Sequence, residues 1–315
     1  MPRDVYLQPG APDPELTPGV VLALARRHGA AAEAVRAVDE SGGEARTYLV
    51  DAGGETLVLK VQRPQQLRPR TSLEKEVFFL NQLAELAPDL PVPRVRGYGR
   101  DSNEVEYTLM TRMPGVALRR VTLSDQERDA ALVALGRLLR RIHVLPQAAF
   151  LASGLFPGDY AFPDLQTRIG EAFLDLAARQ RQVRHPWPLD VPLEEIGRRV
   201  LRALPRTQER AALHSNPYRE HVFVDPATHQ FTGLIDFGDA YISHPAFDLR
   251  RWHRPAERLA LRSGYSADAP LSETFEAAWR VVQILADVTL LASYGETDER
   301  VAGVPADLAL LLSDL

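Results

Sequence analysis

Cysteine is absent from this sequence of 315 residues, which excludes disulfides, thiolate metal sites and thiol nucleophiles. Long hydrophobic runs are also missing, because no apolar stretch approaches the length of a membrane span. Residues 1–19 contain no apolar core of the kind found in signal peptides. We therefore expect a soluble, cytoplasmic protein that does not bind a membrane.

Lysine is almost absent as well. Only two of the 37 basic residues are lysines, Lys60 and Lys75, so the other 35 are arginines. An ammonium group and a planar guanidinium are not interchangeable at a tight site, which makes a retained lysine a candidate for a specific role. Lys60 stands in the middle of the apolar segment 57–61, where a charge needs a partner or an exposed face.

A strongly basic stretch is the third missing feature. The formal net charge is -5 and no cluster of basic residues stands out, which argues against a nucleic-acid partner. The composition is otherwise ordinary for a globular protein, with 45% hydrophobic and 25% charged residues. The length allows two modest domains or one bilobal unit, and no feature indicates an obligate protein partner.

The N-terminal part is predicted to form a sheet. Runs of apolar and β-branched residues indicate strands at 33–39, 47–51, 56–62 and 104–113. Glycine pairs at Gly42-Gly43 and Gly53-Gly54 indicate the turns between the first three strands. The first turn would let backbone amides approach a phosphate, although a glycine pair is more often an ordinary hairpin turn.

A helix is predicted after the third strand, where residues 71–74 have the Thr-x-x-Glu pattern of a capping box. The apolar residues that recur there at helical spacing are Leu73, Val77, Leu80, Leu83 and Leu86. Glu76 falls on this apolar stripe, so its carboxylate needs a cation, and Lys60 is the available one. The alternative is a glutamate at the edge of the stripe that reaches solvent.

The composition becomes helical after Pro114-Gly115, which ends the last predicted strand. We place the boundary between two lobes here, with an N-lobe at 1–113 and a C-lobe at 114–315. Helical patterns in the second lobe cover 124–143, two segments within 153–202, 273–291 and a shorter segment from 305. Ser124 and Glu127 form a second capping-box pattern at the start of the first of these helices.

A hairpin is predicted inside this second lobe. Apolar runs at 222–224 and 233–235 flank the polar connection 225–230. The hairpin would bring His221 and Asp236 to the same edge of the fold. A nitrogen or oxygen ligand beside a carboxylate suits a divalent cation that bridges nucleotide phosphates, although a surface hairpin with polar ends is the simpler alternative.

Taken in chain order, these segments resemble the aminoglycoside phosphotransferase family of small-molecule kinases, which includes macrolide phosphotransferases. The matching motifs are Ser41-Gly42-Gly43, Val58-Leu59-Lys60, Glu76-Val77-Phe78-Phe79-Leu80, 135–143, Ile235-Asp236-Phe237-Gly238-Asp239 and His244-Pro245-Ala246-Phe247-Asp248-Leu249. The resemblance implies an α+β, bilobal, protein-kinase-like fold, with an antiparallel sheet and one helix in the N-lobe and a mainly helical C-lobe. Only a few residues separate 236–238 from the next helical segment, so the long activation segment of protein kinases is missing and a small-molecule acceptor fits better.

The resemblance also implies roles for individual residues. Those expected to bind ATP or GTP are Ser41, Gly42, Gly43, Lys60, Glu76, Met110, Thr111 and Met113. Asp236 and His221 are expected to hold Mg²⁺, and Asp236 and Asn216 to occupy the catalytic positions. His214, Asp239 and Asp248 are expected to support them, Asp248 by bracing the catalytic loop and Asp239 by assisting the metal or the acceptor.

The sequence departs from the family at the catalytic loop. The family pattern is His-Gly-Asp, whereas this chain has His214-Ser215-Asn216, and His221 stands where the family usually has a metal-binding asparagine. Histidine also occurs at that position in some members, but asparagine at 216 cannot take a proton from the acceptor at neutral pH. Asn216 is an introduced change, a sign of a naturally impaired enzyme, or part of an enzyme that works without the carboxylate. The further departures at Ser215 and Pro217 favour natural divergence.

Three functions are compatible with these features. The first is a kinase that transfers the γ-phosphate of ATP or GTP to a hydroxyl of an aminoglycoside-like, macrolide-like or amino-alcohol acceptor, as antibiotic-resistance enzymes do. The second is a pseudokinase that binds nucleotide with little or no transfer, which Asn216 favours. The third is a scaffold that binds no nucleotide, which the retained Lys60 disfavours.

Overall fold

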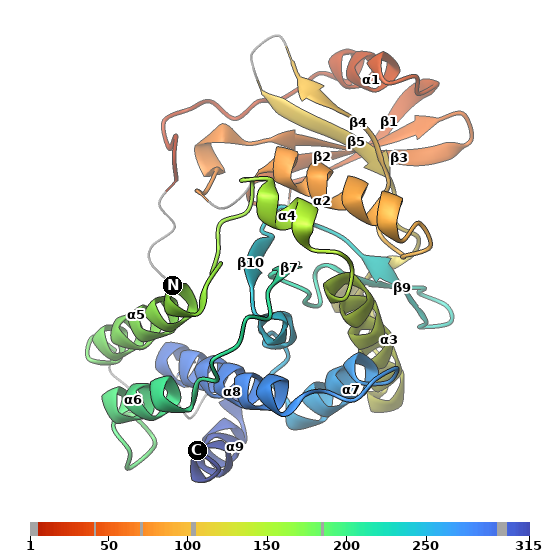
Figure 1. The fold of residues 1–315 in the computed structure, drawn as a ribbon. Helices are drawn as coiled ribbons and strands as arrows, with labels where there is room; N and C mark the ends of the chain where they lie inside the picture. Colours follow the sequence, from red (N-terminus) through yellow and green to blue (C-terminus); the bar gives the residue numbers. More distant parts are fainter. Residues whose placement is uncertain (1–5, 41, 70–71, 102–104, 184–185, 295–300) are drawn as a thin grey trace.

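The computed structural model describes all residues except 1–5, 41, 70–71, 102–104, 184–185 and 295–300. Its N-terminal part contains a five-stranded antiparallel sheet with the order β1-β2-β3-β5-β4, drawn at the top of Figure 1. The strands are β1 (Ala32–Asp39), β2 (Ala45–Ala52), β3 (Glu55–Gln62), β4 (Val95–Arg100) and β5 (Glu106–Thr111). The four predicted strands are present, the last of them shorter than expected. β4 was missed because Gly97 and Gly99 interrupt its apolar pattern.

Side chains alternate between the two faces of this sheet. On β3, Leu57 and Leu59 pack in one cluster with α1 (Pro18–Arg27), whereas Val58 packs on the other face in the cluster that contains α2 (Leu73–Leu86). By the same alternation Lys60 lies on the α2 face. The alternation of side chains along β3 therefore places Lys60 on the side of the sheet that faces α2.

Helix α2 begins one residue later than predicted. Its N-cap is Ser72, whose hydroxyl accepts from the Lys75 amide, so the expected capping box between Thr71 and Glu74 is wrong. Thr71 itself lies outside the described residues. The buried residues of the helix are Leu73, Lys75, Glu76, Phe79, Leu80 and Leu83, whereas Leu86 is exposed. The helix is thus rotated slightly relative to the expected stripe, but Glu76 is still fully buried.

The C-terminal part is mainly helical. Its helices are α3 (Asp125–His143), α4 (Ala148–Ala152), α5 (Phe162–Gln180), α6 (Leu193–Ala203), α7 (Pro255–Tyr265), α8 (Glu273–Tyr294) and α9 (Val304–Ser313). The capping box of Ser124 and Glu127 is present at the start of α3, as predicted. Two small sheets consist of β6 (Val116–Ala117) with β8 (Val222–Val224) and β9 (Phe231–Leu234), and of β7 (Ala211–Leu213) with β10 (Tyr241–Ser243). Strands β8 and β9 form the predicted hairpin.

The two parts meet along α2, which lies beneath the sheet in Figure 1. Phe79 of α2 packs against Phe237 with ring centroids 4.9 Å apart, and both belong to the large core of the C-terminal part. The chain enters that part at Gly115, whose φ of 84° and close approach to the Val224 carbonyl leave no room for a side chain. The helix that carries Glu76 is therefore anchored on the segment that carries Asp236.

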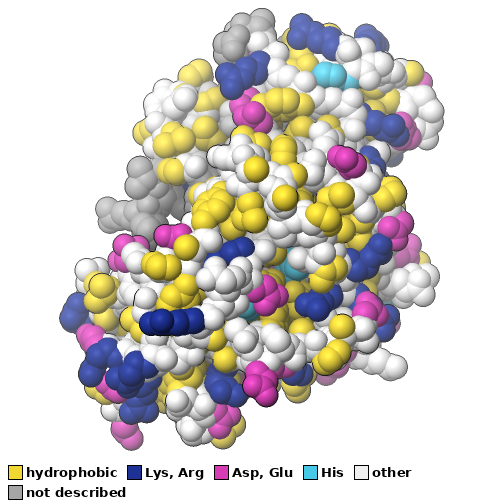
Figure 2. Space-filling model, in the orientation of Figure 1, with side chains coloured by type: hydrophobic (Ala, Val, Ile, Leu, Met, Phe, Trp, Pro, Cys, Tyr) yellow, Lys and Arg dark blue, Asp and Glu magenta, His cyan; other side chains and the backbone are white. Residues whose placement is uncertain are grey.

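Charges of both signs are mixed on the molecular surface. Figure 2 shows basic and acidic side chains side by side near α6, where Glu195 pairs with Arg198 and Arg199. Across the part of the chain that the structure describes, no helix has both the length and the apolar character needed to cross a bilayer.

Candidate active site

A cleft of about 550 Å³ lies between the sheet and the β8–β9 hairpin. The predicted site residues that line it are Gly42, Gly43, Lys60, Glu76, Met110, Thr111, Met113, Asn216, His221, Asp236 and Asp239. His214 and Asp248 are fully buried and do not belong to the lining. Ser41 lies outside the described residues. The fold therefore brings residues from the N-terminal sheet and from the C-terminal part into one cavity.

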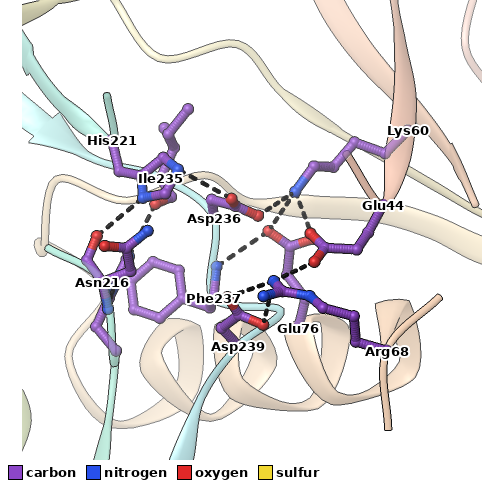
Figure 3. A network of polar contacts seen from close by, with 11 residues as sticks. Glu44, Lys60, Arg68, Glu76, Asn216, His221, Ile235, Asp236, Phe237 and Asp239 are labelled. Atoms are coloured by element: carbon purple, nitrogen blue, oxygen red, sulfur yellow. Dashed lines mark hydrogen bonds and ion pairs between the residues drawn. The ribbon is translucent and has the colours of Figure 1, made fainter. Parts of the chain in front are cut away.

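Lys60 is held by two carboxylates. Its Nζ donates to Glu76 Oε1 and Oε2 at 3.0 and 2.8 Å and to Asp236 Oδ1 at 2.8 Å, as Figure 3 shows. Burial alone would lower the pKa of Lys60, but the charges of Asp236 and Glu76 outweigh it and raise this pKa. The ion pair between Lys60 and Glu76 is the one expected from the sequence, whereas the contact with Asp236 was not anticipated.

Asp236 carries a firmly ionised carboxylate. Burial opposes its ionisation, yet the charge of Lys60 outweighs that effect and holds the pKa of Asp236 well below its usual range. Its side chain remains 38% exposed to the cleft. Glu76 Oε1 also accepts from the Phe237 amide at 3.2 Å, so the helix carboxylate positions the backbone next to Asp236 as well as the lysine.

His221 lies between Asn216 and Asp236. Its Nδ1 donates to the Asn216 carbonyl at 2.8 Å, and its Nε2 is 3.1 Å from Asp236 Oδ2. A neutral imidazole that donates from Nδ1 has a lone pair at Nε2, so two lone pairs face each other unless a proton or a cation lies between them. A proton on Nε2, or a cation bound by both atoms, would make this contact favourable.

A magnesium ion would find two protein donors here, Asp236 and His221. Within the described residues, no group of three or more histidines and carboxylates is arranged to hold a metal alone. Mg²⁺ usually binds through one or two carboxylates and completes its shell with substrate phosphates and water. The donor set therefore fits a cation that enters together with a nucleotide.

The catalytic loop is braced from behind by Asp248. Its carboxylate accepts from the backbone amides of His214 and Ser215 at 2.7 and 2.6 Å and from His143 Nε2 at 3.0 Å. Burial raises the pKa of Asp248, but these hydrogen bonds and the histidines outweigh it and lower this pKa. The bracing role expected for Asp248 is supported by these contacts, and His143 is a packing residue that orients Asp248.

His214 connects the catalytic loop to the hairpin. Its Nε2 donates to the Ile235 carbonyl at 2.8 Å, and its Nδ1 accepts from the Asn216 amide at 3.2 Å. Burial lowers the pKa of His214 to about 4, so the ring is neutral, as these two hydrogen bonds require. The residue is a structural tie between Asn216 and the strand that leads to Asp236.

Two site residues have a left-handed backbone, Ser215 with a φ of 81° and Asp236 with a φ of 74°. This conformation costs a residue other than glycine about 1–2 kcal/mol, and such strained positions cluster at functional sites. The family has glycine where this chain has Ser215, and glycine adopts a positive φ freely. Serine at position 215 therefore has a strained backbone, and the hydrogen bond from its amide to Asp248 helps to hold this conformation.

Several charged residues of the site were not found from the sequence. Arg63 donates to the carbonyl of Gly42 at 3.2 Å and is itself bound by Asp13, which steadies the glycine turn. Arg68 pairs with Glu44 and with Asp239 at 3.1 Å, so Asp239 has a basic partner that was not foreseen. The chain has 35 arginines, so the presence of an arginine at a given position does not indicate a functional residue.

A lysine on a sheet, fixed by a helix carboxylate and facing a positive-φ aspartate across a cleft, defines a protein-kinase-like fold with a phosphotransfer-type site. The family model described as "Phosphotransferase enzyme family" matches residues 35–292. The chain therefore belongs to this phosphotransferase family, as the motifs predicted.

Individual relatives agree with this assignment. Aminoglycoside 3'-phosphotransferase of Streptomyces fradiae is 28% identical over 149 residues, which cover 47% of this chain and 52% of the relative. The aligned segment thus spans about half the length of that curated relative.

Solved structures share the fold. The apoenzyme of macrolide 2'-phosphotransferase MphH from Brachybacterium faecium aligns with a TM-score of 0.58 and 20% identity, over 94% of this chain and 98% of that one. The GDP complex of a mutant of aminoglycoside 2'-phosphotransferase IIIa aligns with a TM-score of 0.60 and 18% identity, over 89% of this chain and 92% of that one.

Proposed function

We propose that this protein is a small-molecule kinase with lobes at 1–113 and 114–315, which transfers the γ-phosphate of ATP or GTP to an acceptor hydroxyl in the cytoplasm. The observation that carries the proposal is the contact of Lys60 with both Glu76 and Asp236 inside one cleft. Such a lysine binds nucleotide phosphates, and catalysis of phosphoryl transfer consists mainly of positioning and charge stabilisation. The acceptor class is an aminoglycoside or a macrolide, the compounds in the names of the relatives above, or a related amino alcohol.

Each residue has a task in this proposal. Backbone groups of 110–113 meet the base, Gly42 and Gly43 cover the phosphates, and Lys60 holds the α- and β-phosphates. Asn216 orients the acceptor hydroxyl. The hydroxyl oxygen forms a bond to the γ-phosphorus while the bond to the β-bridging oxygen breaks, and the hydroxyl proton leaves to solvent, because asparagine cannot accept it.

The metal would be held by Asp236 and His221 and would neutralise charge on the phosphates. We predict that Asp236→Ala weakens Mg²⁺-dependent nucleotide binding more than His221→Ala, because a carboxylate suits hard Mg²⁺ better than imidazole does. Titrations of nucleotide with Mg²⁺ and with excess EDTA separate the metal-dependent part of the affinity. A larger loss in His221→Ala would reverse this ranking.

A pseudokinase is the second candidate, and Asn216 is the observation that favours it. This residue lines the cleft where the family has a catalytic carboxylate. The protein can therefore bind a nucleotide without transferring its phosphate. Since the transition state is loose, the metal and phosphate clamp contributes more than the base. We therefore expect reduced transfer instead of none.

The test is a phosphotransfer screen with ATP and GTP over aminoglycosides, macrolides and small amino alcohols. Formation of a phosphorylated acceptor, detected by mass spectrometry, identifies the kinase and its substrate class. Lys60→Ala in the same screen controls for contaminating activity. Nucleotide binding without any product in the wild-type protein would favour the pseudokinase, and no nucleotide binding would refute both candidates.

A further inference from the structure

Arg68 links the two walls of the cleft. It lies between the 3₁₀ helix Pro64–Gln66 and α2, and its Nη2 donates to Asp239 Oδ2 and Oδ1 at 3.1 and 3.3 Å and pairs with Glu44. Figure 3 shows the guanidinium between the two carboxylates, next to Lys60 and Asp236. Glu44 directly precedes β2, whereas Asp239 follows the β8–β9 hairpin. The ion pairs therefore join the sheet to the segment that carries Asp236.

The strand register places Glu44, a partner of Arg68, at the end of the cleft opposite to the 110–113 segment. On β3, Leu57 lies opposite Thr111 and Lys60 opposite Thr108, while Gln62 lies opposite Ala45, the neighbour of Glu44. A strand advances about 3.3 Å per residue, so Lys60 is about 10 Å from the Thr111 end, and Glu44, which lies opposite Arg63, is about 10 Å further on. With the base at 110–113 and the α- and β-phosphates at Lys60, the Arg68 end faces the terminal phosphate.

Acidic side chains lie on both sides of Arg68 at this end of the cleft. Lys60 pairs with Glu76 and Asp236, and Arg68 pairs with Glu44 and Asp239. Burial raises the pKa of Glu44, and the charge of Asp239 raises it further. Arg68 thus holds together two carboxylates that repel each other. A triphosphate oxygen is a better partner, because a guanidinium matches phosphate geometry with two parallel hydrogen bonds.

We propose that Arg68 exchanges partners during the cycle, pairing with Glu44 and Asp239 in the nucleotide-free protein and with the terminal phosphate when a nucleoside triphosphate is bound. The side chain is 27% exposed, so it reaches the cleft without unpacking the core. This proposal rests on the proposed function and adds a residue that distinguishes a triphosphate from a diphosphate. Release of the diphosphate returns Arg68 to its carboxylates.

The experiment compares the affinities for ATP and ADP, and for GTP and GDP, with Mg²⁺ by calorimetry. In Arg68→Gln we expect triphosphate affinity to fall about 10- to 100-fold, since a charge-assisted phosphate contact is lost, while diphosphate affinity changes less than about threefold. Arg141→Gln is the matched control, because Arg141 also joins two separate segments by a bidentate ion pair, with Asp89, and is not part of the cleft lining.

A second variant separates partner exchange from a purely structural ion pair. Glu44→Gln removes one of the carboxylates that retain Arg68, so we expect triphosphate affinity to rise a few-fold, whereas loss of a merely structural pair would leave affinity equal or lower. An unchanged ratio of triphosphate to diphosphate affinity in Arg68→Gln overturns the proposal alone. If the wild-type protein binds neither nucleotide, the proposed function fails, and this proposal fails with it.

Discussion

Replacement of Lys60 by alanine is expected to lower nucleotide affinity about 10- to 100-fold, the loss of one charge-assisted phosphate contact. The lysine makes three contacts with Glu76 and Asp236, and no arginine pairs with either of these carboxylates in the described part of the chain. The variant also leaves Glu76 buried without its partner, and breaking a buried pair in this way costs about 3–5 kcal/mol of stability. Calorimetry measures the first effect and thermal unfolding the second.

Glu76→Ala is expected to lower nucleotide affinity less than Lys60→Ala does, because it misplaces the lysine without removing it. It also deprives the Phe237 amide of an acceptor, so a lowered melting temperature accompanies the change. Arg36→Ala is a suitable control, since it removes an ion pair with Asp51 from the same sheet but outside the cleft lining. If both cleft variants bind nucleotide like the wild type, Lys60 is not the phosphate-binding lysine.

Asn216→Asp is expected to increase phosphoryl transfer. General-base assistance contributes typically about 10²–10⁴-fold in rate, and a loose transition state places the gain near the lower end. Nucleotide affinity is expected to change little, because Asn216 is assigned to the acceptor and not to the phosphates. The measurement is nucleotide turnover with and without the acceptor found in the screen.

Two controls make this prediction specific. Asn81→Asp makes the same chemical change at an exposed position of α2 and is expected to leave turnover unchanged. The double variant Asn216→Asp/Lys60→Ala is expected to lose the gain, because the new carboxylate needs a bound nucleotide. If Asn216→Asp binds Mg-nucleotide normally and transfers phosphate to none of the acceptors, the result favours the pseudokinase.

The outcome of the Asn216 experiment also bears on Ser215. The strained backbone at this position, with a φ of 81°, is held by Asp248 and its neighbours His143 and His214. The loop is therefore held by buried hydrogen bonds although glycine and aspartate are both replaced in its motif. These hydrogen bonds are compatible with both the kinase and the pseudokinase, so the Asn216→Asp experiment decides between the two.

Local patterns determined much of this protein in advance. Strand alternation placed Lys60 on one face of the sheet, helical spacing placed Glu76 on a buried stripe, and the two apolar runs around 225–230 indicated the hairpin that brings His221 to Asp236. Each of these features depends on residues a few positions apart. In a strand or a helix, the repeat of the backbone alone decides which face each side chain lies on.

Other features were decided only by the tertiary structure. Arg68 pairs with Glu44 and with Asp239, and the second of these residues lies 171 positions further along the chain. Because arginine is so common in this chain, no local pattern distinguishes Arg68. The buried hydrogen bonds of Asp248 depend on how α3 and the loop after β7 lie against the 3₁₀ helix Pro245–Leu249, which side-chain periodicity does not specify. Contacts of this kind arise from the relative placement of whole elements. A sequence pattern encodes the faces of those elements but not which distant charges they bring together.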